Sequence, residues 1–249
     1  MLQRKSKITT LDGLVLLALL GVLAYIIYQV KVKLNYNWQW AIIPQYLFRY
    51  DADSGKWVSN YLIHGLLTTL RLSFWGTLLA TILGTLMGLL RVSKSLFHRM
   101  IARSYVELMR NLPPLVIIFI FYFFISDQIM PIIGIDDFLR SSSPGTQRLF
   151  EVLFSPPQFA SAFIAALFTL AIFEGAYITE IVRAGIESVE KGQWEASHAL
   201  GLSKYHTMRH IIMPQAIQRL LPALAGQFIS LIKYSAIVSV ISIQELSYQ

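Results

Sequence analysis

Five long apolar runs dominate this 249-residue chain. The hydrocarbon core of a bilayer is about 30 Å thick, so a helix that crosses it needs about 20 mostly apolar residues. The runs cover residues 12–31, 60–91, 103–126, 158–183 and 215–243. Hydrophobic residues make up 55% of the chain and the mean hydropathy is +0.55, which excludes an ordinary soluble globular domain. We therefore predict an all-α integral membrane protein with five transmembrane helices.

The basic residues predict how these helices are oriented. If successive runs cross the membrane in alternate directions, eleven Lys and Arg residues between the runs or at their ends fall on one side and six on the other. The first group is Arg4, Lys5, Lys7, Arg91, Lys94, Arg99, Arg103, Arg183, Lys191, Lys204 and Arg209, and the second is Lys31, Lys33, Arg49, Lys56, Arg140 and Arg148. Cytoplasmic loops carry an excess of Lys and Arg, so the N-terminus and the 183–214 connection are predicted to be cytoplasmic, in a bacterial inner membrane. Because these residues are spaced between apolar runs, the net charge of +7 does not indicate nucleic-acid binding.

The runs also divide the chain. Residues 1–10 form a basic cytoplasmic tail and 11–31 a helix that anchors the N-terminus. No small-x-small cleavage site precedes Lys31, so we interpret this helix as retained instead of removed as a signal peptide. Residues 32–59 form an extracytoplasmic loop and 60–249 the main transmembrane domain. Within that domain, Pro and Ser clusters predict an outer loop at 127–157 with one short helix at 146–154.

The 183–214 connection is too polar to cross a bilayer, yet its apolar residues recur at helical spacings. Gly201 is typical of a helix end because glycine accepts the left-handed conformation, and the Ser203 hydroxyl can cap a following helix. Pro214 ends that second helix or joins it to the last span. We predict two short cytoplasmic helices within 186–214, joined by a sharp turn. An amphipathic pair that touches only lipid headgroups is the alternative.

Four motifs follow one another along the chain: Tyr105–Pro114, Ala176–Ile186, Glu195–Gly201 followed by Ile211–Pro214, and Pro222–Lys233. Together they resemble type I ABC importer permeases of the polar amino-acid family, which includes histidine, glutamine and general amino-acid permeases. The third motif resembles the EAA loop of that family, with Ser197 in place of an alanine and Met213 in place of a leucine.

This resemblance implies a permease subunit that imports amino acids through the inner membrane. It implies that the EAA helices dock on a separate ATPase, with Glu195 as the charged contact, Ala196 and Ala199 permitting close approach, Gly201 setting the angle and Pro214 closing the motif. It also implies a second permease subunit, identical or different, and an extracytoplasmic solute-binding protein. No cofactor is expected on this chain, because ATP and Mg²⁺ would bind the ATPase. Members continue through a final helix beyond the 243–246 region, so the last transmembrane helix is expected to be missing here.

Charged residues inside the spans are candidates for function, because burying a charge costs at least about 2.5 kcal/mol. Glu174 could meet a substrate ammonium group in the pathway or pair with a cation such as Arg71. Lys233 could line the pathway, hold a carboxylate, or extend to the membrane surface.

Two further pairs have the spacing of intrahelical ion pairs. Glu107 and Arg110, and likewise Glu180 and Arg183, lie three residues apart, so they are predicted to pair structurally, with gating as the alternative. Pro113 and Pro114 must kink the third helix.

Enzymatic readings lack the necessary residues. The sequence contains no phosphate-binding Gly-x4-Gly-Lys-Ser/Thr run, no His-Glu-x2-His motif and no cysteine, so we predict neither ATP hydrolysis nor a metal site on this chain. An ion-driven secondary transporter or channel is the main competing hypothesis, although the halves show no inverted repeat. A membrane scaffold is a second competitor, and it would need no polar pathway.

Overall fold

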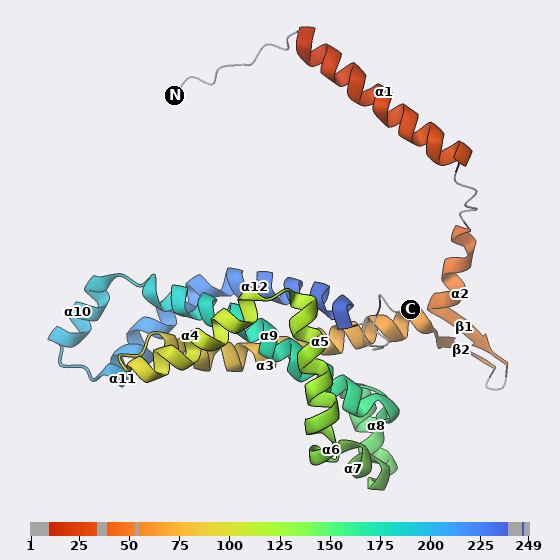
Figure 1. The fold of residues 1–249 in the computed structure, drawn as a ribbon. Helices are drawn as coiled ribbons and strands as arrows, with labels where there is room; N and C mark the ends of the chain where they lie inside the picture. Colours follow the sequence, from red (N-terminus) through yellow and green to blue (C-terminus); the bar gives the residue numbers. More distant parts are fainter. Residues whose placement is uncertain (1–9, 34–38, 53–54, 239–245, 247–249) are drawn as a thin grey trace. The chain divides into compact units, whose positions relative to one another are not determined.

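The computed structural model describes residues 10–33, 39–52, 55–238 and 246 (Figure 1). Residues 1–9 of the predicted basic tail, parts of the 32–59 loop and the end of the last predicted span, 239–243, lie outside the described residues. The chain divides into two compact units, residues 1–44 and 45–249.

The first unit is built around one apolar helix. Helix α1 (Thr10–Lys33) is followed by a short 3₁₀ turn (Trp40–Ile42). The stretch Thr10–Val32 is long and apolar enough to cross a membrane, and none of its most apolar 18 residues is buried within the chain. A helix that is apolar on all sides must be covered by something other than water, so α1 suits contact with lipid or another protein.

The predicted 32–59 loop contains a small hairpin that the sequence did not suggest. After the short helix α2 (Ile43–Leu47), strand β1 (Phe48–Asp51) pairs antiparallel with β2 (Lys56–Ser59), with Phe48 opposite Ser59. Tyr50 and Trp57 face each other across the strands, with ring centroids 5.7 Å apart. Such cross-strand aromatic pairs stabilise short hairpins.

Three long helices form the core of the second unit: α3 (Tyr61–Arg91), α9 (Ala160–Glu187) and α12 (Met213–Val238), which pack against one another (Figure 1). Helix α9 is the candidate span most covered by the other helices, with 67% of its most apolar 18 residues buried within the chain. It approaches its neighbours closely at glycines. A β-carbon on Gly84 of α3 would lie 2.6 Å from the Ile178 side chain, and one on Gly185 would lie 2.1 Å from Leu220 of α12. Small residues at such contacts let membrane helices approach closely.

The predicted third span, 103–126, is wrong as a single helix. Helix α4 (Leu96–Asn111) ends before Leu112, and α5 (Pro114–Phe124) begins after it. Leu112 and Pro113 are extended because a residue that precedes a proline is restricted from the helical conformation. The stretch of membrane length starts only at Pro114 and runs to Ile133. Helix α4 is instead amphipathic and carries charged residues on one side.

The connection between α5 and α9 is more helical than predicted. A π-helical stretch (Ile125–Ile129) leads into α6 (Met130–Ile133), α7 (Ile135–Ser141) and α8 (Pro144–Leu153), before a 3₁₀ turn (Pro157–Phe159) that enters α9. The expected 146–154 helix corresponds to α8, capped by the Ser143 hydroxyl. Helix α7 was not predicted. It forms where Leu139 can be buried, at 2% exposure, after the left-handed Gly134.

The described residues contain five helices that are long and apolar enough to cross a membrane. They confirm the predicted fold class, an all-α membrane protein, with the small hairpin as its only described β-structure.

The close contact at Gly84 predicts a strong effect of a single methyl group. Gly84→Ala would place a β-carbon 2.6 Å from Ile178 and 2.9 Å from the Gly175 carbonyl oxygen, so α3 and α9 must separate. We expect a loss of about 1–3 kcal/mol, the usual cost of overpacking, seen as a lower unfolding midpoint in detergent. Gly21→Ala in α1, where nothing lies within 4 Å, is the control and should not lower the midpoint. Equal midpoints for both variants would contradict this packing.

Candidate functional site

The polar connection after α9 forms a short helix and a sharp turn at one end of the bundle (Figure 1). Helix α10 (Lys191–Ala199) ends in two capping bonds: the Gly201 N–H donates to the His198 carbonyl at 3.0 Å, and the Leu202 N–H donates to the Ser197 carbonyl at 3.1 Å. Gly201 has φ +72°, the left-handed conformation that this motif requires. The Ser203 hydroxyl then accepts from the His206 N–H. The predicted helix stop and cap are confirmed.

The second predicted short helix is not separate from the last span. Helix α11 (Lys204–His206) continues through a π-helical stretch (Thr207–Ile212) directly into α12, so Pro214 lies inside one helical segment that runs from Lys204 to Val238. Proline has no N–H to donate to the preceding turn. The wide π-helical turn immediately before it is where the regular bond pattern changes.

Helix α10 buries one side and exposes the other. Ser197 is 1% exposed and its hydroxyl donates to the Gln193 carbonyl at 2.6 Å. Trp194 packs against the apolar cluster at the end of α9 and the start of α12. Glu195, Ala196 and Ala199 are exposed. The serine that departs from the family pattern is therefore internal, and the residues predicted to meet a partner face outward.

Polar contacts connect the α10 region to both neighbouring long helices. Gln215 at the start of α12 donates to the Gln193 side chain at 3.3 Å. Arg219 of α12 donates to the backbone carbonyl of Ser188, which follows α9. Helix α12 is thus bonded both to α10 and to the residue that follows α9.

Glu180 joins the C-terminal ends of α3 and α9. It accepts from Arg91 of α3 at 3.0 Å and from Arg183 at 2.9 Å, and Arg183 also pairs with Glu187. The predicted contact between Glu180 and Arg183 is present and belongs to a network of four charges. These side chains are partly buried, so they are less screened by solvent than an exposed pair.

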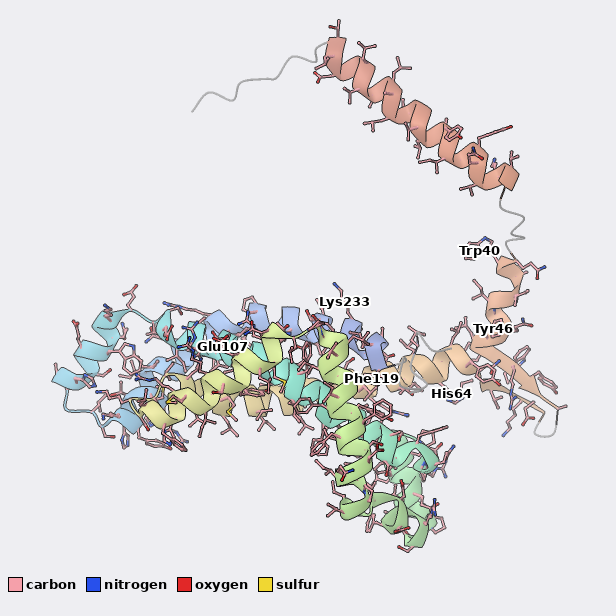
Figure 2. All side chains as sticks on the ribbon, in the orientation of Figure 1. Trp40, Tyr46, His64, Glu107, Phe119 and Lys233 are labelled. Carbon is pink, nitrogen blue, oxygen red and sulfur yellow. The ribbon has the colours of Figure 1, made fainter. Side chains whose placement is uncertain are left out.

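The predicted pair of Glu107 and Arg110 does not form. Glu107, labelled in Figure 2, lies 3.6 Å from Arg103 and accepts from Asn111 at 2.9 Å. Arg110 instead lies over the ring of Tyr177 on α9, 5.3 Å from its centroid. The aromatic face on the neighbouring helix attracts this cation, which sequence spacing alone could not reveal.

Glu174 is fully buried in the core, and its partner is not Arg71. Its Oε2 accepts from Gln227 of α12, whereas its Oε1 has no partner among the described residues. Gln227 lies within the motif Pro222–Lys233, and Glu174 was singled out as a charge within a predicted span, yet only the packing of α9 on α12 brings them together.

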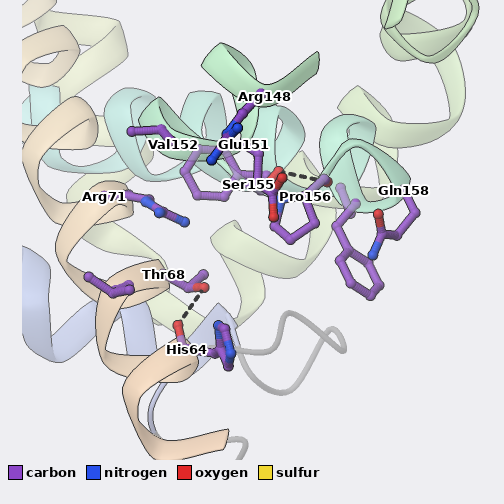
Figure 3. A pocket seen from close by; sticks show the side chains of 13 residues that line it. His64, Thr68, Arg71, Arg148, Glu151, Val152, Ser155, Pro156 and Gln158 are labelled. Carbon is purple, nitrogen blue, oxygen red and sulfur yellow. Dashed lines mark hydrogen bonds between the residues drawn. The ribbon is translucent and has the colours of Figure 1, made fainter. Parts of the chain in front are cut away.

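Arg71 lies in a cavity of about 550 Å³ between α3, α8 and the start of α9 (Figure 3). Arg148 and Glu151 of α8 and His64 and Thr68 of α3 also line it. The sequence missed this group, because its members come from separate segments. The one available signal was Arg71, a charge within a predicted span.

Lys233 is exposed and points away from the neighbouring helices (Figure 2). It is therefore available to a second subunit or to lipid. Among the residues that the structure describes, no group of three or more His, Asp or Glu side chains could hold a metal ion.

The profile of one protein family, described as binding-protein-dependent transport system inner membrane component, matches residues 76–248. The chain belongs to this family. The match includes α10, the Gly201 turn and the buried Glu174. This chain is thus a permease subunit embedded in the inner membrane, a transport component without an enzymatic reaction of its own, and a separate ATPase hydrolyses ATP.

Similar proteins support this assignment. The permease is 40% identical over 186 residues to the probable amino-acid ABC transporter permease protein YckA of Bacillus subtilis (strain 168), covering 75% of this chain and 70% of that one. It is 36% identical to the probable glutamine ABC transporter permease protein GlnP of the same organism, covering 75% and 72%. A crystal structure of an amino acid ABC transporter with histidines matches with a TM-score of 0.57 and 34% identity, over 76% of this chain and 75% of that one.

Replacing each of two glycines in the α10 region with alanine should change the stability of the region in opposite directions. Gly201→Ala forces a β-carbon into the left-handed conformation at a cost of about 1–2 kcal/mol. Gly192→Ala, inside α10 and with nothing within 4 Å, should stabilise the helix by about 0.5–1 kcal/mol. Hydrogen exchange at residues 196–206 should therefore accelerate in the first variant and slow in the second. The same direction of change in both would contradict the turn geometry.

The hydrogen bond between Gln227 and Glu174 predicts that substitutions at the two residues have non-additive effects on the free energy of unfolding. Gln227→Leu leaves a buried carboxyl group without a partner and should cost about 1–3 kcal/mol in unfolding free energy. Adding Glu174→Met removes that group, so the double variant should recover most of the loss. Unfolding midpoints of the four forms in detergent give the coupling. Additive effects would show that the two side chains do not interact.

Proposed function

We propose that this permease carries amino acids across the inner membrane. We also propose that α10 contacts the separate ATPase and transmits its conformational change to the permease. The proposal for the cargo is supported by the proteins that the chain matches, two of which are described as amino-acid or glutamine permeases and one as an amino acid ABC transporter.

One observation carries the coupling proposal: α10 presents an outward face while its other side is fixed to the bundle. Glu195 supplies the charged contact, and the small side chains of Ala196 and Ala199 let an ATPase surface approach the helix closely. Gly201 holds the angle of the turn, and Pro214 marks the junction with α12. The contacts of Gln215 and Arg219 then pass a displacement of α10 to α9 and α12.

The remaining parts of the proposal follow from orientation. The N-terminal tail (1–10) and the 186–214 segment lie in the cytoplasm, α1 anchors the chain before the 60–249 transmembrane domain, and residues 32–59 face outward. Partners are two ATPases, a second permease subunit and an extracytoplasmic solute-binding protein. ATP and Mg²⁺ bind the ATPases, and this chain needs no cofactor. The Lys and Arg distribution supports this orientation.

Glu174 and Lys233 are proposed to act along the substrate pathway. Glu174 keeps one carboxylate oxygen unpartnered in the described structure, and Lys233 faces away from the bundle, where a second permease subunit would complete the pathway. Glu107, Arg110, Glu180 and Arg183 have the structural role of holding α4 and α9 in place.

Reversing the charge at Glu195 tests the coupling. In the assembled transporter in proteoliposomes, Glu195→Lys should abolish ATP-driven amino-acid uptake and weaken retention of the ATPase. Truncating one partner of a charged contact typically costs about 2–5 kcal/mol, and reversal adds repulsion. Uptake of labelled amino acid and co-purification of the ATPase are the measurements.

Asp137→Lys is the matched control, since Asp137 is exposed on α7 and undergoes the same charge change. It should retain the ATPase as the unmodified permease does. Full uptake by the Glu195 variant, or accessibility labelling that places residues 190–212 outside the cell, would contradict the coupling proposal.

A further inference from the structure

A second cavity lies at the end of the bundle where α3 ends, α4 begins and α10 and α11 project (Figure 1). Its volume is about 770 Å³. Its lining carries four cationic side chains, Arg91, Lys94, Arg99 and Lys204, and one carboxylate, Glu187. The cations come from α3, the turn after it, α4 and α11, so the fold gathers them from distant parts of the sequence.

The charge of this cavity is not balanced within the described chain. Arg91 is bound by Glu180, and Glu187 is paired with Arg183. Lys94, Arg99 and Lys204 form no ion pair with any residue that the structure describes. An excess of basic residues on the cytoplasmic side orients a membrane protein, but it does not require three unpaired cations around one cavity. Their mutual repulsion favours binding of an anion.

Apart from Ser93 and His198, the rest of the lining is apolar. Leu89, Val92 and Ile186 contribute aliphatic side chains, and Trp194 and Met208 contribute larger ones. A free anion such as inorganic phosphate would gain nothing from these walls. A ligand with a charged head and an apolar body would use both parts of the cavity.

The neighbouring start of α4 indicates where the cavity lies relative to the bilayer. Leu96, Phe97 and Met100 are 64%, 69% and 57% exposed, while Ala102, Val106 and Met109 face the bundle. Helices with an exposed apolar face and a basic face lie at the boundary between lipid and water. The cavity beside this turn is therefore at the depth of the headgroups.

We propose that this cavity binds the phosphate of an anionic phospholipid from the adjacent leaflet. Lys94, Arg99 and Lys204 surround the phosphate oxygens, and the apolar wall holds the glycerol and upper acyl region. Basic pockets at this depth recognise such headgroups. The lipid would connect the turn between α3 and α4 with the start of α11, beside the helix proposed to meet the ATPase.

The test uses the assembled transporter with its ATPase, exchanged from phosphatidylglycerol or phosphatidylcholine nanodiscs into mild detergent. Native mass spectrometry then counts the lipids retained. The complex should retain phosphatidylglycerol in preference to phosphatidylcholine. Each basic side chain near a membrane surface contributes about fivefold in affinity, so Lys94→Gln/Arg99→Gln/Lys204→Gln should lose on the order of 100-fold. Each single substitution should lose about fivefold, which keeps the test available if the triple variant fails to assemble.

Arg49→Gln/Lys56→Gln/Arg140→Gln removes three exposed cations elsewhere and should retain the lipid. Equal retention by both triple variants, or of both lipids, would overturn the proposal. Complete displacement of the lipid by inorganic phosphate would assign the cavity to a free anion instead. Binding by the permease alone that disappears in the assembled transporter would assign it to the ATPase. No transport step enters the measurement, so its result is independent of cargo and coupling.

Discussion

The close approach of α9 to α3 and α12 is the contact on which the rest of the structure depends. Glycines at 84, 88 and 185 leave no room for a β-carbon, and branched side chains of Ile178, Val182 and Leu220 fill the space against them. In lipid, helix association depends on such packing because exclusion of water no longer drives it. The same approach brings Gln227 to the buried Glu174. It also aligns the C-terminal ends of α3 and α9, where Glu180 pairs with Arg91 and Arg183.

The end of the bundle that carries α10 combines a rigid turn with the exposed residues Glu195, Ala196 and Ala199. The Gly201 motif fixes the direction of the chain after α10, and Trp194 packs α10 against the bundle on the side where Ser197 is buried. Arg91, Glu180 and Arg183 tie α3 to α9 at the same level. This arrangement suits the transmission of movement. The side of α10 that is proposed to contact the ATPase is exposed, and the segment behind it is connected to α9 and α12 by specific bonds.

Several local features could be predicted because they depend only on neighbouring residues. The helix end at Gly201 and the Ser203 cap follow from the conformations that glycine and serine allow. The 103–126 span is wrong as a single helix because the Pro113-Pro114 pair, predicted only to kink it, ends α4 at Asn111 and starts α5. The partners of Arg110 and Glu174 could not be predicted, since Tyr177 and Gln227 are distant in the sequence and only helix packing brings them near.

The sequence by itself determined the membrane class, the number of long apolar helices and the polar turn with its glycine and serine, because hydrophobic length and local backbone preference act over a few neighbouring residues. Its motifs also indicated the family. Only the tertiary structure decided which charges pair, which sides of α10 are buried, and that cations from α3, α4 and α11 surround one cavity. Those outcomes depend on the rotation and register of packed helices, which no single segment encodes.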